Sequence, residues 1–246
     1  MLKLLGHTSS VSCLSKGITS NTIISGSWDC SVRVWLITGN GADALCSTLK
    51  EIKDHSAAIW SVASCSTSGV IISASADKTI KMYNSNYECT YTFTGHTDCV
   101  RSVLFLNESS FLSCANDAII KKWDINTKKC VREYLGHSNY IYAMAPINNS
   151  GGKMFASCGE DSSVLIWNGE IGEQVATLTI PAQSLWCITS LPNGDLVVGS
   201  SDGICRVFTT DSTQFAQPEI LEKYENAVVM RKAQISETLG GIKKTE

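Results

Sequence analysis

The sequence predicts an all-β fold made of five repeats of short strands, and three observations support this prediction. The first is a histidine that follows Gly or Asp, as in Gly95-His96. The second is a serine placed four residues before an aspartate, as in Ser113 and Asp117. The third is an aromatic residue six positions after that aspartate, as in Trp123. The four complete sets are His7, Ser25, Asp29 and Trp35; His55, Ser73, Asp77 and Tyr83; His96, Ser113, Asp117 and Trp123; and His137, Ser157, Asp161 and Trp167.

The spacing of these sets identifies the kind of repeat. The aspartates at positions 29, 77, 117, 161 and 202 lie 48, 40, 44 and 41 residues apart. A period of roughly forty residues with Gly-His and Trp-Asp-like marks is typical of the WD repeat, which folds as one blade of a β-propeller. The fifth copy keeps Asp202 and Phe208 but has no histidine. We therefore expect a WD40-type β-propeller of five blades over residues 1–208 and a helix plus linker tail over residues 209–246.

Each repeat is expected to contain four strands, because short apolar or alternating runs are separated by clusters of Gly, Asn, Asp and Ser. An outer strand precedes the histidine, and an inner, a second and a third strand follow it. The third strand alternates with a period of two, as in Ser31-Val32-Arg33-Val34-Trp35. The expected outer strands are 1–5, 47–52, 90–94, 131–135 and 174–180, and examples of the others are 59–63, 100–106, 70–75, 196–200, 79–83 and 119–123.

The two ends of the repeat array leave two architectures open. Residues 1–5 hold the place of an outer strand and could complete the blade whose third strand ends at Phe208. Such pairing would close a ring of five blades. The alternative is a fragment of a larger ring, since WD propellers more often have seven blades.

The tail differs from the repeats in its pattern. Residues 218–234 are predicted to form a helix, with Pro218 in its first turn and acidic residues near its start. Ile220, Tyr224 and Val228 form one apolar stripe, which we expect to lie on the propeller. Residues 236–246 are polar and predict a linker. Residues 39–45 predict an enlarged hairpin loop, because the first interval between repeats is the longest.

Composition excludes several classes of protein. The net charge of −3 and the pI near 5.8 argue against nucleic-acid binding and against anionic membranes. No run of about 18 apolar residues exists that would predict a membrane span. The eleven cysteines are odd in number and contain no Cys-x-x-Cys pair. We expect buried free thiols and a cytoplasmic and nuclear location, where thiols stay reduced.

The recurring Ser, His and Asp invite a comparison with a hydrolase triad. A catalytic triad occurs once in a protein, whereas this set occurs four times, which favours a structural tetrad. In such a tetrad a buried indole N–H donates to Ser, Ser contacts one imidazole nitrogen, and Asp accepts from the other. All four histidines are used in this way, so we expect neither an enzyme nor a zinc site. The sequence has no Gly-x-Gly-x-x-Gly or Walker pattern, and no cofactor is expected.

A second group of residues predicts a partner-binding surface. Trp60 and Trp186 begin inner strands, and Trp28 directly precedes a turn aspartate. Such positions surround the axis on the top face of a propeller. Aromatic residues and Arg with few Lys are typical of protein-binding hot spots. The alternative is that some of these aromatic residues only fill the central channel. The predicted set is Trp28, Trp60, Arg101, Asn116, Tyr140, Tyr142, Glu160 and Trp186.

Several segments resemble the phospholipase A-2-activating protein family. They are Gly95 to Arg101, Phe111 to Ala118, Gly136 to Tyr142, Pro181 to Cys187 and Asn193 to Gly199, and the resemblance covers nearly all of residues 1–208. It implies a seven-bladed WD propeller that binds ubiquitin, of which this chain is similar to the third to seventh blades. It also implies a non-enzymatic adaptor in ubiquitin-dependent protein degradation and ubiquitin recycling. In that family, docking on the valosin-containing-protein ATPase uses a domain that this chain is expected to lack. The alternative hypothesis is a scaffold that binds a partner other than ubiquitin on the same face.

Overall fold

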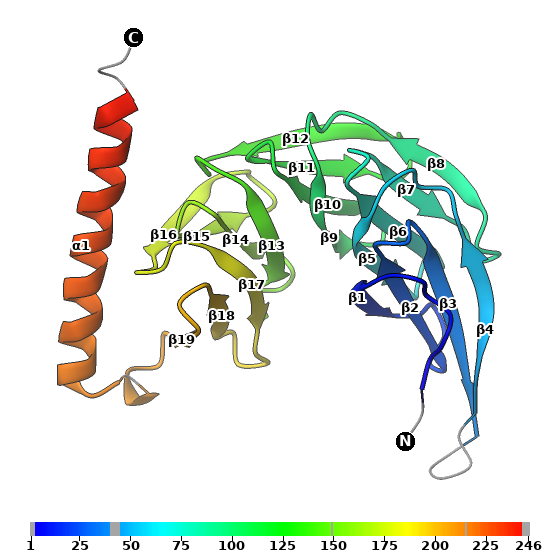
Figure 1. Ribbon diagram of the computed structural model, residues 1–246, viewed down its shortest axis with the longest axis horizontal. Helices are drawn as coiled ribbons and strands as arrows, with labels where there is room; N and C mark the ends of the chain where they lie inside the picture. Colours follow the sequence, from blue (N-terminus) through cyan, green and yellow to red (C-terminus); the bar gives the residue numbers. More distant parts are fainter. Residues whose placement is uncertain (1–2, 40–44, 149, 215, 243–246) are drawn as a thin grey trace. The chain divides into compact units, whose positions relative to one another are not determined.

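The computed structural model describes residues 3–39, 45–148, 150–214 and 216–242 (Figure 1). In this part of the chain the strands form five antiparallel sheets, here called the first to fifth blades in chain order. Each blade is a meander in which consecutive strands pair. The chain divides into two compact units, Met1–Leu135 with three blades and Gly136–Glu246 with two blades and a helix.

The first unit contains three blades of four strands each (Figure 1). The outermost strand of each blade ends three residues before a histidine or, in the third blade, two residues before it. The strands are β1 (Val11–Lys16), β2 (Thr22–Ser27), β3 (Val32–Thr38) and β4 (Leu45–Ile52) in the first blade; β5 (Ile59–Cys65), β6 (Val70–Ser75), β7 (Ile80–Tyr83) and β8 (Cys89–Phe93) in the second; and β9 (Val100–Asn107), β10 (Ser110–Ala115), β11 (Ile119–Asp124) and β12 (Lys129–Leu135) in the third.

The second unit contains one blade of four strands and one of three. In the described residues β19 pairs with β18 alone, so the fifth blade has no outer strand there. The strands are β13 (Ile141–Pro146), β14 (Met154–Gly159), β15 (Ser163–Asn168) and β16 (Gln174–Thr179) in the fourth blade, and β17 (Leu185–Ser190), β18 (Leu196–Ser200) and β19 (Cys205–Phe208) in the fifth. A short 3-10 helix, η2 (Ser212–Gln214), leads to helix α1 (Pro218–Ile242).

The core of the first unit lies between neighbouring blades. Ile59 of β5 is fully buried against the first blade, and Val100 of β9 is fully buried against the second. Phe93 ends the outer strand β8 and packs edge-to-face on Trp123 of the third blade, with ring centroids 5.3 Å apart. The second strand of each blade is the most deeply buried, as its continuous apolar run predicts. Stacking of successive repeats therefore supplies the core that one blade alone could not provide.

Helix α1 packs on the second unit through polar as well as apolar contacts. The Tyr224 hydroxyl donates to the carbonyl of Thr179 at 3.1 Å, and the Tyr224 ring lies 6.2 Å from that of Phe208. The Arg231 guanidinium donates to the Ser162 hydroxyl at 3.0 and 3.1 Å. The prediction that Ile220 belongs to the packed stripe is wrong, because its side chain is 59% exposed. Tyr224 and Arg231, which make these polar contacts with the blades, both lie beyond the first turn of α1.

Three further expectations need correction. The helix does not end at 234 but continues to Ile242, through the segment expected to be a linker. The predicted strand over residues 1–5 is not formed at residues 3–5, and positions 1–2 lie outside the described residues, as does most of the loop expected at 39–45. The cysteines form no disulfide in the described residues, yet they are not all buried. The exposed ones are Cys89, Cys130, Cys187 and Cys205.

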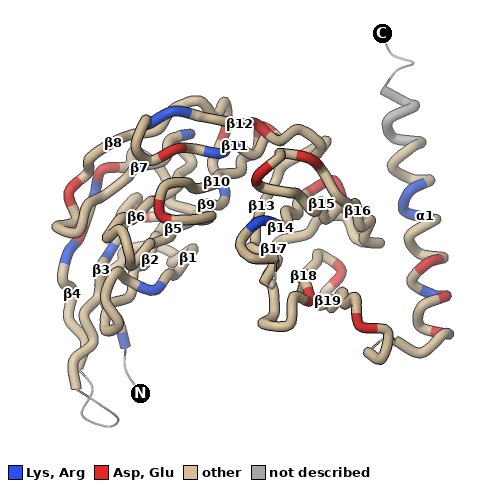
Figure 2. The backbone as a smooth tube through the Cα atoms, turned by 180° about the vertical axis from the view of Figure 1, so that it is seen from behind, with Lys and Arg blue, Asp and Glu red and all other residues tan. Residues whose placement is uncertain are grey.

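Charged residues of both signs are interspersed along the strands of the first unit (Figure 2). Two of the charge pairs join third and outer strands: Arg33 donates to Glu51 at 2.6 Å, and Lys121 pairs with Glu133. The basic residues in these pairs are therefore neutralised within the sheet. No described helix is both long and apolar enough to cross a lipid bilayer.

Gly159 is required at the end of β14 because another backbone segment approaches it closely. A Cβ atom at this position would lie 2.0 Å from the carbonyl oxygen of Tyr140. We expect Gly159→Ala to lower the free energy of unfolding by about 2 kcal/mol, since the two strands must separate. Urea unfolding measures the loss. Gly199→Ala is the control, because a Cβ there would meet only the Sγ atom of the exposed Cys187, a side-chain end that can turn aside; an equal loss in both variants would contradict the steric explanation.

Candidate functional site

The predicted tetrads come together in four blades. In the first, His7 contacts Asp29 through Nδ1 at 2.8 Å and Ser25 through Nε2 at 2.7 Å, and the Trp35 indole donates to Ser25 at 2.8 Å. In the others the His–Asp, His–Ser and aromatic–Ser distances are 2.8, 2.7 and 3.3 Å for His55, Asp77, Ser73 and Tyr83; 2.7, 2.7 and 2.8 Å for His96, Asp117, Ser113 and Trp123; and 2.8, 2.7 and 2.9 Å for His137, Asp161, Ser157 and Trp167.

These networks are buried and join three strands of each blade. The four imidazole side chains are between 0% and 5% exposed. The serine hydroxyl is hydrogen-bonded both to the aromatic side chain and to the histidine, so its hydrogen-bonding capacity is used inside the tetrad. The tetrad therefore recurs because it stabilises each blade. In the described residues no group of three or more His, Cys, Asp or Glu side chains could hold a metal ion.

Sequence reasoning missed further donors to the turn aspartates. The backbone N–H after each histidine donates to the same carboxylate, as Thr8 does to Asp29 at 2.9 Å. A hydroxyl two residues after the aspartate adds a bond of 2.6 Å, from Ser31 in the first blade and Thr79 in the second. Burial raises the pKa of Asp29, but the hydrogen bonds from Ser31, Thr8 and His7 outweigh it and hold that pKa far below its usual range. The recurrence of a hydroxyl residue two positions after the aspartate could have predicted this additional hydrogen bond from the sequence.

The fifth blade replaces the tetrad with an ion pair. Val198 and Phe208 stand where the serine and the tryptophan would be, so no buried polar atom there needs a histidine. Arg206 instead donates to Asp202 at 2.6 Å and to Ser200 at 2.7 Å. The hydrogen bond from the Arg206 guanidinium, helped by that from Ser200, lowers the pKa of Asp202 to about 2.

The first unit brings together four of the predicted partner-binding residues, here called the first cluster: Trp28, Trp60, Arg101 and Asn116. The Trp28 and Trp60 rings lie 5.5 Å apart, and the Arg101 guanidinium lies 4.1 Å from the Trp60 ring. Asn116 accepts a hydrogen bond of 2.9 Å from Arg101. Trp28 is 49% exposed, and the Trp60 indole nitrogen is buried without a hydrogen-bond partner among the described residues. The cluster is a cation–π stack in which about half of Trp28 is accessible.

The second unit holds the second cluster, Tyr142, Glu160 and Trp186. The Tyr142 and Trp186 rings are stacked 4.8 Å apart at 23°, and the Tyr142 hydroxyl donates to Glu160 at 2.9 Å. Trp186 is 54% exposed. Tyr140 is 41% exposed, and its carbonyl accepts a bond from the backbone N–H of Glu160. Exposed aromatic rings held by neighbours lose little side-chain entropy on binding, which suits them to protein recognition.

A β-bulge in the backbone positions those members of both clusters that lie on inner strands. Every inner strand has an irregular register one residue after its start, where a residue is skipped in the pairing. The skipped residues are Ser12, Trp60, Arg101, Tyr142 and Trp186. A β-bulge leaves its extra residue unpaired and redirects its side chain, and bulges are frequent beside functional sites. The same bulge therefore presents an aromatic residue or Arg in four of the five blades.

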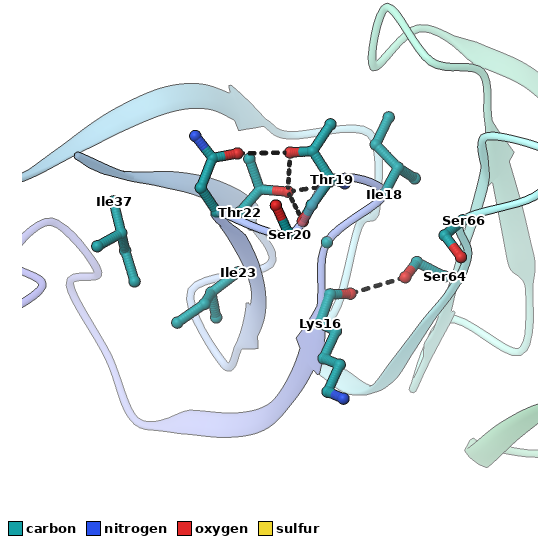
Figure 3. A pocket seen from close by; sticks show the side chains of 11 residues that line it. Lys16, Ile18, Thr19, Ser20, Thr22, Ile23, Ile37, Ser64 and Ser66 are labelled. Atoms are coloured by element: carbon teal, nitrogen blue, oxygen red, sulfur yellow. Dashed lines mark hydrogen bonds between the residues drawn. The ribbon is translucent and has the colours of Figure 1, made fainter. Parts of the chain in front are cut away.

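One pocket of the first unit is lined by no residue of either cluster (Figure 3). It has a volume of about 640 Å³ and lies at the β1–β2 turn of the first unit. Its polar side chains largely bond one another or the backbone: Thr19 contacts Asn21 and Thr22, and Ser64 donates to the Lys16 carbonyl. Lys16 is the one charged residue among those lining it. This pocket offers no convergent set of polar groups for a ligand.

Comparison with known proteins settles the family. A model described as "WD domain, G-beta repeat" matches residues 1–35, 46–84, 87–124, 128–168 and 172–209. The chain belongs to the WD40 repeat family. The predicted fold class is confirmed: a five-bladed, all-β WD40 propeller with one C-terminal helix.

The WD40 chain is also similar to longer proteins. It is 38% identical over 241 residues to "Ubiquitin homeostasis protein lub1" of Schizosaccharomyces pombe, covering 98% of this chain and 31% of that protein. It is 30% identical over 231 residues to "Ubiquitin fusion degradation protein 3 homolog" of Caenorhabditis elegans, covering 92% and 27%. Among solved structures, the WD40 propeller domain of Doa1 matches with a TM-score of 0.77 and 35% identity, covering 87% of this chain and 68% of that one. The WD40 chain thus spans about a third or less of the length of these two curated relatives.

Proposed function

We propose that this chain is a non-catalytic, ubiquitin-binding WD40 adaptor that acts in ubiquitin-dependent protein degradation and ubiquitin recycling, as in the phospholipase A-2-activating protein family. Two similar proteins are named for ubiquitin homeostasis and ubiquitin fusion degradation, and this supports ubiquitin or ubiquitylated proteins as partners. The observation that carries the proposal is the pair of pre-stacked aromatic clusters placed by the inner-strand bulges. Recognition through a surface needs no cofactor and no catalytic group.

The chemistry of the clusters fits a small, largely apolar protein patch. In the first cluster the half-exposed Trp28 lies in a stack with Arg101 and Asn116. In the second, Trp186 is half exposed and Glu160 accepts a hydrogen bond from its stacking partner Tyr142. Apolar contact in the centre with hydrogen bonds at the rim is the usual anatomy of a protein interface. Small protein interfaces give weak, reversible binding, as expected for an adaptor that passes on its cargo.

The test is an NMR titration of isotopically labelled ubiquitin with the unlabelled chain. We expect Trp60→Ala combined with Tyr142→Ala to weaken binding about thirtyfold or more, because each substitution removes the ring against which an exposed tryptophan is held. Tyr91→Ala is the control: Tyr91 is an exposed aromatic residue on the outer strand β8, outside both clusters. Thermal unfolding of each variant checks that the fold is kept.

Two outcomes would change the proposal. Shifts that the double variant leaves unchanged would exclude the two clusters as the binding site. No shifts with the unaltered chain, together with capture of another protein that Trp60→Ala and Tyr142→Ala abolish, would favour a scaffold with a partner other than ubiquitin.

A further inference from the structure

The residue directly before each turn aspartate differs in charge from blade to blade. In four blades it is neutral, namely Trp28, Ala76, Asn116 and Ser201, whereas in the fourth blade it is Glu160. In the third and fourth blades this residue accepts a hydrogen bond from the residue skipped at the inner-strand bulge of the same blade. The two positions therefore form a bonded pair that can be compared between these blades.

The two pairs have opposite net charge. In the third blade a cation bonds a neutral acceptor, because the Arg101 guanidinium donates to the Asn116 amide oxygen at 2.9 Å. In the fourth blade a neutral donor bonds an anion, because the Tyr142 hydroxyl donates to the Glu160 carboxylate at 2.9 Å. A phenol donates one hydrogen, whereas a carboxylate can accept several. Glu160 forms no ion pair within the described part of the chain, so no basic side chain there neutralises it.

An exposed aromatic ring belongs to the same cluster as this carboxylate. Tyr142 joins the two, since its ring is stacked on Trp186 with centroids 4.8 Å apart while its hydroxyl bonds Glu160. Trp186 is 54% exposed. The first cluster shows what such a ring accepts, because the Arg101 guanidinium lies 4.1 Å from the centre of the Trp60 ring. The second cluster has the ring and the acceptor but contains no basic residue.

One basic residue of α1 approaches the same turn without pairing with Glu160. The Arg231 guanidinium donates to the hydroxyl of Ser162, which lies two residues after Glu160, at 3.0 and 3.1 Å. The carboxylate between them in the chain, that of Asp161, is bonded to His137 at 2.8 Å. Arg231 therefore anchors the helix, and the charge of Glu160 stays available to a group outside the chain.

We infer that the second cluster binds the guanidinium of an arginine on the surface of the partner protein, which stacks on the exposed Trp186 ring and donates to the Glu160 carboxylate. This inference rests on the proposed function, because it names the side chain of ubiquitin that the adaptor recognises. Arginine fits both parts of the cluster, since its planar guanidinium stacks on aromatic rings and donates to a carboxylate in a fixed fork. Charge complementarity of this kind sets specificity and association rate more than total affinity.

The first test is the NMR titration of labelled ubiquitin with the whole chain carrying Glu160→Gln. We expect about tenfold weaker binding and a smaller dependence on salt, because the amide still accepts from Tyr142 but does not pair with a cation. Glu173→Gln is the matched control: it removes the same charge from an exposed glutamate at the other end of β15, and binding should be unchanged. Equal affinities of the two variants would overturn the inference and leave the proposed function standing.

A charge exchange identifies the side chain on the partner. Ubiquitin variants in which each arginine is replaced in turn by Glu are titrated with the unaltered chain and with Glu160→Arg. One of them should bind the unaltered chain about tenfold more weakly, and Glu160→Arg should restore most of that loss, since the two charges are then exchanged. Restoration for none of the ubiquitin variants would contradict the inference.

A probe without ubiquitin separates failure of this inference from failure of the proposed function. N-acetyl-arginine methylamide is titrated into the isotopically labelled chain, and the indole N–H signal of Trp186, identified by its loss in Trp186→Phe, is followed. The neutral citrulline analogue, which keeps the shape of the arginine without its charge, is the control. We expect the arginine compound to bind about fivefold more tightly, and Glu160→Gln to remove the difference.

The two possible results of the probe have different meanings. Equal binding of the arginine and citrulline compounds would overturn the arginine site, whether or not ubiquitin binds. A preference for arginine that Glu160→Gln removes, in a chain that causes no shifts in ubiquitin, would support the site and show that its partner is an arginine-bearing protein other than ubiquitin.

Discussion

His96→Ala is expected to lower the free energy of unfolding by about 3 kcal/mol. The imidazole is 1% exposed, and it joins Asp117 and Ser113 with two contacts of 2.7 Å. Its removal leaves the buried carboxylate with one donor fewer and the Trp123–Ser113 bond without its next member. A buried polar group left without its hydrogen-bond partner lowers the free energy of unfolding by more than the hydrogen bond itself contributed. Urea unfolding followed by tryptophan fluorescence measures the loss.

Two conservative variants show whether the hydrogen bonds carry this effect. The amide of His96→Asn can reach Asp117, and that of His96→Gln can reach Ser113, so each should recover part of the stability. A hydrolase role for the set would give the opposite pattern, with stability near that of the unaltered chain and a lost turnover. An unchanged urea midpoint in His96→Ala would contradict the structural role of the tetrad.

The tetrads were predictable from sequence because their members repeat at fixed offsets and their hydrogen-bonding groups have few ways to combine. The ion pair of the fifth blade was not predictable in this way. Arg206 lies four residues after Asp202, and Arg33 lies four residues after Asp29. Yet Arg33 pairs with Glu51 of the outer strand, whereas Arg206 pairs with Asp202. The carboxylate that pairs with this arginine depends on whether an outer strand lies beside the third strand. The local sequence around the arginine does not contain that information.

The partner-binding residues were likewise predicted from register, but their presentation was not. The bulge one residue into each inner strand is a property of the backbone, because the skipped residue differs in type, for example Ser12, Trp60 and Arg101. The end of α1 was misjudged for a related reason. Ser236 and the Gly240-Gly241 pair are weak helix formers and read as a linker, yet the helix continues to Ile242. Local propensity is a weak guide once a helix has been nucleated by good helix formers and by packing such as that of Tyr224.

Stability is expected to fall as the pH drops below about 4, because the turn aspartates must stay ionised. Burial alone would raise the pKa of Asp77, yet hydrogen bonds from His55 and Thr79 outweigh it and hold that pKa far below its usual range. The pKa of Asp117 is lowered in the same way, against burial, chiefly by His96. A carboxyl whose pKa is depressed by folding stabilises the native state above its unfolded pKa. That stabilisation disappears as the pH falls through the folded value.

The measurement is the urea midpoint at pH 7, 5, 4 and 3, which we expect to be roughly halved at pH 3. Asp77→Asn and Asp117→Asn should lower the midpoint at pH 7 and flatten its dependence on pH, because an amide fills the same space but cannot ionise. Glu222→Gln, on the exposed side of α1, is the matched control and should change neither quantity. A pH dependence as steep in the two aspartate variants as in the unaltered chain would show that other carboxylates cause the acid sensitivity. The tetrads would then stabilise the blades by geometry, with no contribution from the charge of Asp77 or Asp117.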